Sequence, residues 1–376
     1  MKRHERPPVN SAGREGRRGV ARTCSGAPVC HNAVVQNRRR RPSISDVARA
    51  AGVSVGTVSN VLNRPELVAP ATRERVEAAV EELGFVRNAS ARQLRQGAIT
   101  TVGAVLLDIR NPFFTDVARG VEDRLAREDH TLMLASSDDD PAREAKYLRL
   151  FEEHGVLGLL VVPTRQSLDH LVQAEARGLG VVLLDAPSPL PSLSSVSVDD
   201  EAGGALAAEH LLALGHDSIV VLNGPHDFRQ AEARRAGVDR AVRAAGLDPD
   251  RVVDELTLST LDASGGDAGI GRWIAEHDGR VPPAVFCVND LVAIGVQRHL
   301  RRIGGTDLLR GTAVVGYDDI EIAGELAVPL TSVRQPTYAM GEVAADLVLG
   351  HGRGEEPRQV VFDPELVVRA SSTHRD

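Results

Sequence analysis

Hydrophobic residues between positions 43 and 84 repeat with the period of an α-helix, and two short turns interrupt the pattern. Ser43 gives the first helix an N-cap signal, Gly52 ends that helix, and Ser54 caps the second. Pro70 opens a third helix, which ends at Gly84. The apolar positions that face inward are Ile44, Val47, Ala48, Ala51, Val58, Val61, Leu62, Val76, Ala79, Val80 and Leu83. The pattern predicts a compact unit of three helices, with a tight turn between the first two.

Beyond residue 100, short apolar strands alternate with helical patterns. The strands predicted in the first half are Val102–Leu107, Leu132–Ala135, Leu157–Val162 and Val181–Leu184. The second half repeats the alternation, with strands at Ile219–Leu222, Ala284–Cys287 and Ala313–Gly316 and helices near 229–245, 264–277, 290–303 and 337–349. Such alternation predicts parallel sheets covered by helices on both faces, here in two similar halves. Ligands of these sheets bind at the carboxyl ends of the strands, so we expect a cleft between the halves.

Composition adds a contrast between the two ends of the chain. The 376 residues are 42% hydrophobic and 26% charged, which predicts several packed domains. The longest apolar runs, such as residues 156–162, are far shorter than the roughly 18–20 residues that cross a bilayer, so no membrane contact is predicted. Residues 1–41 carry 11 Lys and Arg against 2 acids, whereas residues 101–376 carry 26 against 44. A basic end joined to an acidic body indicates that the terminal region contacts nucleic acid.

The first 41 residues are rich in Arg, Gly and Pro and have no apolar stretch that would make a secretory signal. We expect residues 1–41 to be a disordered basic arm, or else a stretch ahead of a start codon assigned too far upstream. Cys24, Cys30 and Cys287 are too few for a disulfide framework, and Cys24, Cys30 and His31 lack the paired spacing of a zinc site. The expectation is a protein of the reducing cytoplasm, with no metal and no cofactor.

The segment from Asp46 to Asn63, DVARAAGVSVGTVSNVLN, resembles the headpiece of the lactose-repressor/galactose-repressor family of bacterial transcription regulators. The similarity continues through residues 71–76 and 83–94 and then covers essentially all of 101–370. The resemblance implies an N-terminal all-α helix-turn-helix headpiece at 42–87, a hinge helix or linker at 88–97, and an α/β two-lobed body at 101–371. This body, with its parallel sheets, is like that of a periplasmic binding protein.

A helix-turn-helix places the N-terminal side chains of its second helix against base edges in the major groove. By resemblance, Val55, Gly56 and Asn60 occupy the base-reading positions, and Asn60 stands where the family usually has Arg. Thr57, Ser59 and the run Arg38–Arg41 are expected to contact phosphates. Such contacts position the protein on DNA but do not select a base sequence. The alternatives are that Gly56 merely weakens the helix and that Asn60 is an ordinary solvated residue.

The same resemblance places a hinge helix at Asn88–Arg95, with Asn88 as its N-cap and Ala91 and Leu94 contacting DNA. Leu94 would wedge into the minor groove and kink the duplex. Because so short a helix is marginal in water, we expect it to form only where two copies meet on DNA. In the alternative interpretation, this segment is a linker whose Leu94 packs on the body.

Four residues near predicted strand ends are candidates for an effector site: Phe113, Arg234, Asn289 and Asp318. Arg234 matches the effector-binding arginine of the family, and an amide, a carboxylate and a guanidinium together suit hydrogen bonding to vicinal hydroxyls. The alternatives are that Phe114 belongs to the core, and that Asp290 and Asp319 only cap the helices that follow. Leu261 stands where the family often has an aromatic residue, which weakens the case for a sugar.

Together these features predict a sequence-specific DNA-binding transcriptional regulator, a repressor of a carbohydrate uptake or catabolic operon. Its partners would be double-stranded operator DNA, a second copy of the chain in a homodimer, and a small-molecule effector, expected to be a sugar, between the two lobes. Regulation of nucleoside or other metabolite genes, and a transporter solute-binding protein, are alternatives. An enzyme using Asp138–Asp140 or Asp199–Asp200 is a further rival, but the sequence shows no set of nucleophile, base and orienting residue.

Overall fold

The computed structural model describes residues 42–85, 99–164, 168–226 and 228–373. It divides into two compact units, residues 1–88 and 89–376, which we describe separately. We call the described part of the first unit the headpiece and that of the second the body.

The headpiece is a helical unit, as predicted. Its elements are α1 (Ile44–Ala51), α2 (Val55–Asn63), the 3-10 turn η1 (Pro65–Leu67) and α3 (Pro70–Leu83). Ser43 and Asp46 form a capping box at the start of α1, and Gly52 ends that helix in the left-handed conformation, with φ of 62°. Ser54 caps α2, so only three residues separate the two helices. Val47, Val58 and Val76 are fully buried where the three α-helices meet.

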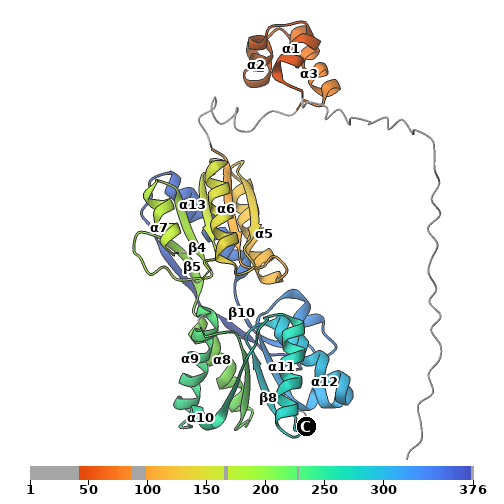
Figure 1. The fold of residues 1–376 in the computed structure, drawn as a ribbon, viewed down its shortest axis with the longest axis vertical. Helices are drawn as coiled ribbons and strands as arrows, with labels where there is room; N and C mark the ends of the chain where they lie inside the picture. The colour runs from red at the N-terminus through yellow and green to blue at the C-terminus, as the bar shows by residue number, and fades with distance from the viewer. Residues whose placement is uncertain (1–41, 86–98, 165–167, 227, 374–376) are drawn as a thin grey trace, which may run out of the picture. The chain divides into compact units, whose positions relative to one another are not determined.

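The body contains two six-stranded, mostly parallel sheets, each the centre of one lobe (Figure 1). Sheet A of the N-lobe has the order β11-β5-β4-β3-β1-β2. Its strands are β1 (Thr101–Leu106), β2 (Thr131–Ser136), β3 (Gly158–Val161), β4 (Gly180–Leu184), β5 (Ser194–Val198) and β11 (Gln359–Phe362). Residues alternate between the two faces of a strand, and both faces are apolar here: Val102, Ala104 and Leu106 face one side and Val105 the other.

Helices cover both faces of sheet A. One face packs against α5 (Pro112–Ala126) and α13 (Thr337–Gly352), and the other against α6 (Pro141–Glu153) and α7 (Leu168–Ala176). Helices α5 and α13 approach closely, because a Cβ on Gly120 would lie 2.1 Å from the backbone oxygen of Tyr338. A larger residue at this position would force the two helices apart.

Sheet B of the C-lobe repeats the plan with the order β12-β10-β9-β8-β6-β7. Its strands are β6 (Ile219–Asn223), β7 (Val253–Thr257), β8 (Ala284–Cys287), β9 (Ala313–Asp318), β10 (Thr331–Arg334) and the antiparallel β12 (Glu365–Val367). One face packs against α8 (Asp200–Ala213), α9 (Arg229–Ala244) and the short α10 (Pro249–Val252). The other packs against α11 (Ala263–Glu276), α12 (Asp290–Gly311) and the 3-10 turn η2 (Glu321–Glu325).

Three crossings join the lobes: at Asp199 between β5 and α8, at Gln335–Pro336 between β10 and α13, and at Asp363–Pro364 between β11 and β12. The predicted fold class, a helical headpiece with a two-lobed α/β body, is confirmed. Helix α12 runs further than the predicted 290–303, because Gly305, with φ of 69°, joins two helical pieces across a kink. Among the helices that the structure describes, none has the length and apolar character needed to cross a membrane.

Candidate functional site

The predicted base-reading residues lie on the first two turns of α2. Val55, Gly56 and Asn60 are exposed, and Val55 exposes 44% of its surface although it is apolar. The opposite face of α2 buries Val58 and Val61 in the headpiece core. The helix therefore presents a contiguous surface that contains no charged side chain. Helices of this kind read DNA through hydrogen bonds and apolar contacts at base edges.

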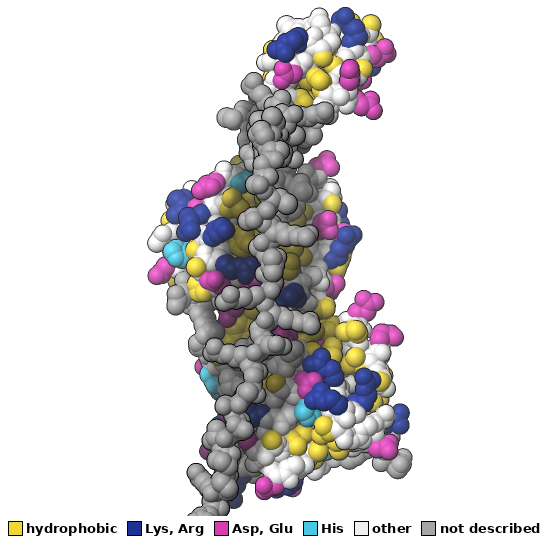
Figure 2. Space-filling model, turned by 45° about the vertical axis from the view of Figure 1, so that its right-hand side comes forward, with side chains coloured by type: hydrophobic (Ala, Val, Ile, Leu, Met, Phe, Trp, Pro, Cys, Tyr) yellow, Lys and Arg dark blue, Asp and Glu magenta, His cyan; other side chains and the backbone are white. Residues whose placement is uncertain are grey.

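The two predicted phosphate-contacting residues of α2 are only partly exposed. The Thr57 hydroxyl lies 2.9 Å from that of Ser54, and Ser59 accepts hydrogen bonds from the Asn63 amide through its carbonyl at 2.8 Å and its hydroxyl at 3.2 Å. Both hydroxyls are thus held in fixed positions at the helix surface. Residues 42–85 carry 4 Arg against 6 acids, and Figure 2 shows acidic side chains on the headpiece alongside basic ones. The helical unit alone is therefore not basic.

Asn88, Ala91 and Leu94 of the predicted hinge, and the arm at residues 1–41 with Arg38–Arg41, lie outside the described residues.

In the body, all four predicted effector residues line one cavity of about 360 Å³ between the lobes. The size is within the range of roughly 300–1,000 Å³ that is usual for ligand pockets. The N-lobe contributes loops that follow its strands, and the C-lobe contributes the corresponding ends of its own strands. The residues that line the cavity include Asp108, Arg110, Phe113, Phe114, Asp138, Asp139, Asp185, Arg234, Leu261, Asp262, Asn289, Asp318 and Gln335.

Arg234 of α9 is almost completely buried, with 6% of its surface exposed. Its Nε donates to Asp200 Oδ1 at 2.9 Å, its Nη1 donates to the carbonyl of Val288 at 2.5 Å, and its guanidinium lies 3.5 Å from the centre of the Tyr317 ring. Burial is the largest single effect and acts to lower the pKa of Arg234, but the neighbouring acidic groups, Asp200 first among them, together outweigh it. The pKa is therefore raised, and Arg234 stays charged. The cleft thus has a rigid guanidinium in its wall.

Asp318 ends strand β9 and lines the cleft, with a backbone φ of 107° that residues other than glycine rarely adopt. Its carboxylate accepts a hydrogen bond from Gln335 Nε2 at 2.8 Å, and Gln335 belongs to one of the lobe crossings. Burial raises the pKa of Asp318 to about 6, against the opposing effect of Arg234. Asp318 therefore connects the end of β9 to a lobe crossing and interacts electrostatically with the buried Arg234.

Asn289 is the N-cap of α12, and its Oδ1 accepts from the backbone amide of Val292 at 2.9 Å. Its Nδ2 donates to the carbonyl of Leu261 at 3.0 Å, which fixes the orientation of the amide. The idea that Asp290 caps this helix is wrong. Asp290 is fully buried and accepts instead from the Ile320 amide and the Ser332 hydroxyl. These two hydrogen bonds hold the loop after β9 in place.

Asp319 does not cap a helix either, since its carboxylate accepts from Arg334 and Arg369 and the turn that follows has no side-chain cap. Phe114 belongs to the core, as the alternative interpretation holds, and Phe113 belongs to the same core. Both rings are more than nine-tenths buried, belong to the N-lobe core and line the cavity, with their centres 4.9 Å apart at an interplanar angle of 81°.

Sequence reasoning missed Asp185, which follows β4 and reaches across the cleft to the start of α9. Its carbonyl accepts from Arg229 at 3.0 Å and Gln230 at 2.8 Å, and its Oδ2 accepts from Gln230 at 2.8 Å. Burial, followed by the charge of Asp200, raises the pKa of Asp185 to about 7. Its position directly after a predicted strand was a usable signal, since the same rule selected Asp318.

Two lining residues carry buried oxygens that find no hydrogen-bond partner among the described residues: Asp185 Oδ1 and Gln335 Oε1. Buried oxygens normally have partners, so these two mark a polar part of the cleft wall whose hydrogen-bonding capacity is not used within the described residues. Gln335 was missed because the strand before it, β10, was not predicted from the sequence.

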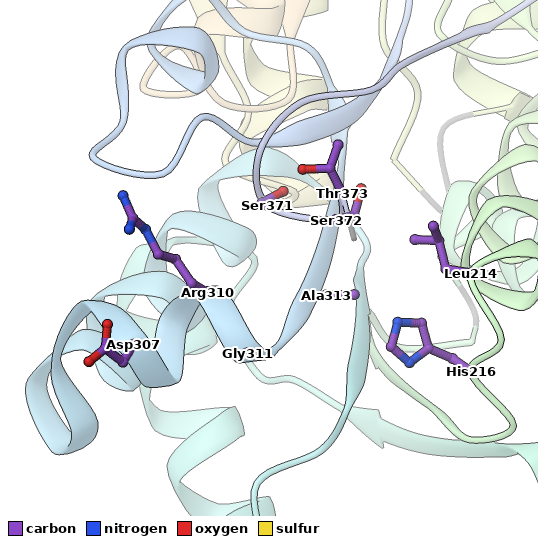
Figure 3. A pocket seen from close by; sticks show the side chains of 9 residues that line it. All are labelled: Leu214, His216, Asp307, Arg310, Gly311, Ala313, Ser371, Ser372 and Thr373. Atoms are coloured by element: carbon purple, nitrogen blue, oxygen red, sulfur yellow. The ribbon is translucent and has the colours of Figure 1, made fainter. Parts of the chain in front are cut away.

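A second cavity, of about 350 Å³, lies at the far end of sheet B, with Ala313, His216 and Arg310 on its walls (Figure 3). Ala313 begins strand β9 and Asp318 ends it, so the two cavities lie at opposite ends of one strand. Ligands of parallel sheets bind at carboxyl ends, which favours the cleft. No group of three or more His, Cys, Asp or Glu residues in the described part of the chain could hold a metal ion.

Comparison with known proteins connects both units to one class. Residues 43–88 match the family described as "Bacterial regulatory proteins, lacI family", and residues 208–372 match a "Periplasmic binding protein-like domain". The class is therefore that of transcriptional regulators with a helix-turn-helix headpiece and a ligand-binding type of body.

Two relatives align with nearly the whole chain. The transcriptional repressor PurR of Aliivibrio fischeri is 31% identical over 338 residues, covering 89% of this chain and 99% of the relative. The regulator MalR of Streptomyces coelicolor is 34% identical, covering 88% and 96%. The chain belongs to the LacI family of bacterial transcription regulators, whose members are not enzymes.

Solved structures share the fold. A complex of the regulator CelR with cellobiose is 31% identical, with a TM-score of 0.62, and covers 88% of this chain and all of that one. The Lac repressor dimer bound to operator and the anti-inducer ONPF is 26% identical, with a TM-score of 0.72 over 89% of this chain and all of that one.

Proposed function

We propose that the protein is a homodimeric repressor that binds a double-stranded operator and is controlled by a sugar bound between the lobes of its body. Its targets would be genes of carbohydrate uptake or catabolism, and it would act in the cytoplasm. The observation that carries the proposal is the cleft: Phe113, Arg234, Asn289 and Asp318 come from four distant segments and line one cavity. The same chain carries a helix-turn-helix headpiece.

The chemistry of the cleft favours a hydroxyl-rich ligand. Arg234 has N–H groups left to donate, the unpartnered oxygens of Asp185 and Gln335 can form hydrogen bonds, and the two Phe rings offer apolar surface. Two related regulators have sugars in their structures: CelR with cellobiose, and a LacI-family regulator from Enterococcus faecium with ribose. A nucleoside or another metabolite remains the alternative ligand class.

Dimer formation is proposed because a near-palindromic operator requires two headpieces, as in the Lac repressor dimer on its operator. For α2, we propose that Val55, Gly56 and Asn60 read bases while Thr57 and Ser59 contact phosphates. Asn88, Ala91 and Leu94 would then contact DNA next to the headpiece.

The test is to select operator sequences from a random duplex library and to measure binding of the full chain by fluorescence anisotropy. Cellobiose, maltose, ribose and adenosine are then added one at a time. We expect a near-palindromic selected sequence and a change of operator affinity with one of the sugars. A response to adenosine alone would favour the nucleoside alternative, and failure to select any sequence would contradict the proposal.

A further inference from the structure

The cleft is strongly acidic. Its walls contain six carboxylates, Asp108, Asp138, Asp139, Asp185, Asp262 and Asp318, against two guanidiniums, Arg110 and Arg234. An anionic ligand entering such a site would be repelled unless a guanidinium were free to pair with it.

Both arginines among the described residues of the cleft wall are already paired with carboxylates. Arg110 holds Asp108 in a bidentate pair, with Nε to Oδ1 at 2.9 Å and Nη2 to Oδ2 at 2.9 Å. Arg234 pairs with Asp200, which is buried behind the cleft wall with 2% of its surface exposed. The charge of each arginine is therefore compensated before any ligand arrives.

Asp200 also compensates a second arginine. Its Oδ2 accepts from Arg229 at 3.0 Å, while its Oδ1 accepts from Arg234, so the carboxylate bridges the first and second turns of α9. The carboxylates of Asp185 and Asp318 lie close enough to interact electrostatically with Arg234. Three carboxyl groups, those of Asp185, Asp200 and Asp318, thus lie close to the guanidiniums of Arg229 and Arg234.

We propose that Asp200 neutralises the arginines of the cleft, so that the cleft admits an uncharged, hydroxyl-rich effector and excludes phosphorylated or carboxylated sugars. Arg234 retains N–H groups beyond its two bonded ones and can still donate to a hydroxyl oxygen. The amide oxygen of Gln335 can only accept, so it requires a donor, which a hydroxyl supplies and a phosphate dianion or a carboxylate does not. Asp200 acts through Arg234 and is a positioning residue. The inference rests on the proposed function, in that the effector occupies this cleft.

The test is to titrate the full chain with inorganic phosphate by calorimetry, because phosphate probes the anion preference without knowledge of the effector. Asp200→Asn removes the compensating charge and keeps the size of the side chain. Asp199→Asn is the matched control, because Asp199 is the exposed N-cap of α8 and asparagine also caps helices well. Phosphate bound by the basic arm contributes equally to all of these proteins.

Asp200→Asn is expected to bind phosphate at least about tenfold more tightly than the wild type or Asp199→Asn, through a charge-assisted pair with Arg234. Adding Arg234→Gln should abolish the gain. If Asp200→Asn does not fold, Asp200→Asn with Arg229→Gln restores the charge balance and still leaves Arg234 uncompensated. Equal phosphate affinity in Asp200→Asn and Asp199→Asn would overturn the proposal, as would wild-type phosphate binding that Arg234→Gln removes.

A second arm compares neutral and anionic partners by thermal shift: glucose with glucose 6-phosphate, ribose with ribose 5-phosphate, and cellobiose with cellobionate. Stabilisation by a neutral member and not by its anionic partner supports the selectivity, and preference for an anionic member overturns it. Neither arm involves DNA. The two proposals can therefore fail separately. A cleft that prefers anions would not contradict operator binding, and a chain that does not bind an operator would not contradict the preference for neutral ligands.

Discussion

The headpiece and the body organise their polar groups in opposite ways. The candidate DNA contacts of α2 lie within six consecutive residues, which are exposed or partly exposed on a helix with no charged side chain. The candidate ligand contacts of the body come from segments up to about two hundred residues apart in the sequence, and several are buried ionisable groups. Substitutions on the exposed surface of α2 can change DNA specificity without loss of folding. Substitutions in the buried network of the cleft change ligand specificity and stability together.

The largest expected effect separates the two regions. A fragment of residues 99–376 should lose operator affinity by about 1,000-fold or more, the usual gap between specific and non-specific binding. It should bind a sugar ligand as the full chain does, because the cleft lies entirely within the body. Anisotropy with the selected operator and calorimetry with the ligand measure the two properties. Operator binding by the fragment would show that the headpiece is not the DNA-binding unit.

The second prediction concerns pH and the stability of the body. Asp185 has its pKa raised from 3.8 to about 7, so the folded chain keeps a proton that the unfolded chain releases between these values. The stability due to Asp185 is therefore present at low pH and is lost as pH rises towards 7. Asp185→Asn should remove this dependence, which is on the order of 3 kcal/mol.

Urea unfolding at pH 5 and pH 8 measures the effect, with Asp199→Asn as the control. The wild type and the control should both lose stability over this interval relative to Asp185→Asn. Parallel pH profiles for all three proteins would show that Asp185 does not carry a displaced pKa.

The third prediction tests the cleft through Asp318. Asp318→Asn keeps the shape and the hydrogen bond from Gln335 but removes the charge, and should weaken ligand binding by roughly 1.5–3 kcal/mol. Operator affinity without ligand should stay near the wild-type value. Asp346→Asn is the control, since Asp346 pairs with Arg124 on the surface of the N-lobe. Equal ligand affinity in the two variants would show that Asp318 does not contribute to ligand binding.

The smallest expected effect concerns the base that Asn60 reads. Asparagine pairs with the adenine edge and arginine with guanine, so Asn60→Arg should change the preferred base at one position of each half-site, by about 1–3 kcal/mol. Sequence selection with both proteins measures this change, and overall stability should not alter because Asn60 is exposed. An unchanged selected sequence would identify Asn60 as a solvated surface residue.

The same contrast explains what the sequence could predict. The helices of the headpiece follow from caps and spacing between neighbours, and the Ser43 capping box and the Gly52 stop are found as expected. The strand ends at Asn289 and Asp318 were also predictable, because parallel sheets place their carboxyl ends along one edge.

Pairing across the lobes could not be predicted. The bond from Gln335 to Asp318 and those from Arg229 and Gln230 to Asp185 depend on how two sheets meet, which no local pattern encodes. The burial of Asp290 was missed for the same reason: a carboxylate next to a helix start has the signature of a cap, although its partners here lie 30 and 42 residues away.

The central claim is that the cleft and the operator site are coupled within one protein. The most direct test is the affinity of the effective sugar for the full chain, measured by calorimetry with and without a saturating operator duplex. Coupling is reciprocal, so operator should change the sugar affinity by the factor by which the sugar changes operator affinity, typically about 5- to 150-fold. A sugar affinity that is the same with and without operator would contradict the account.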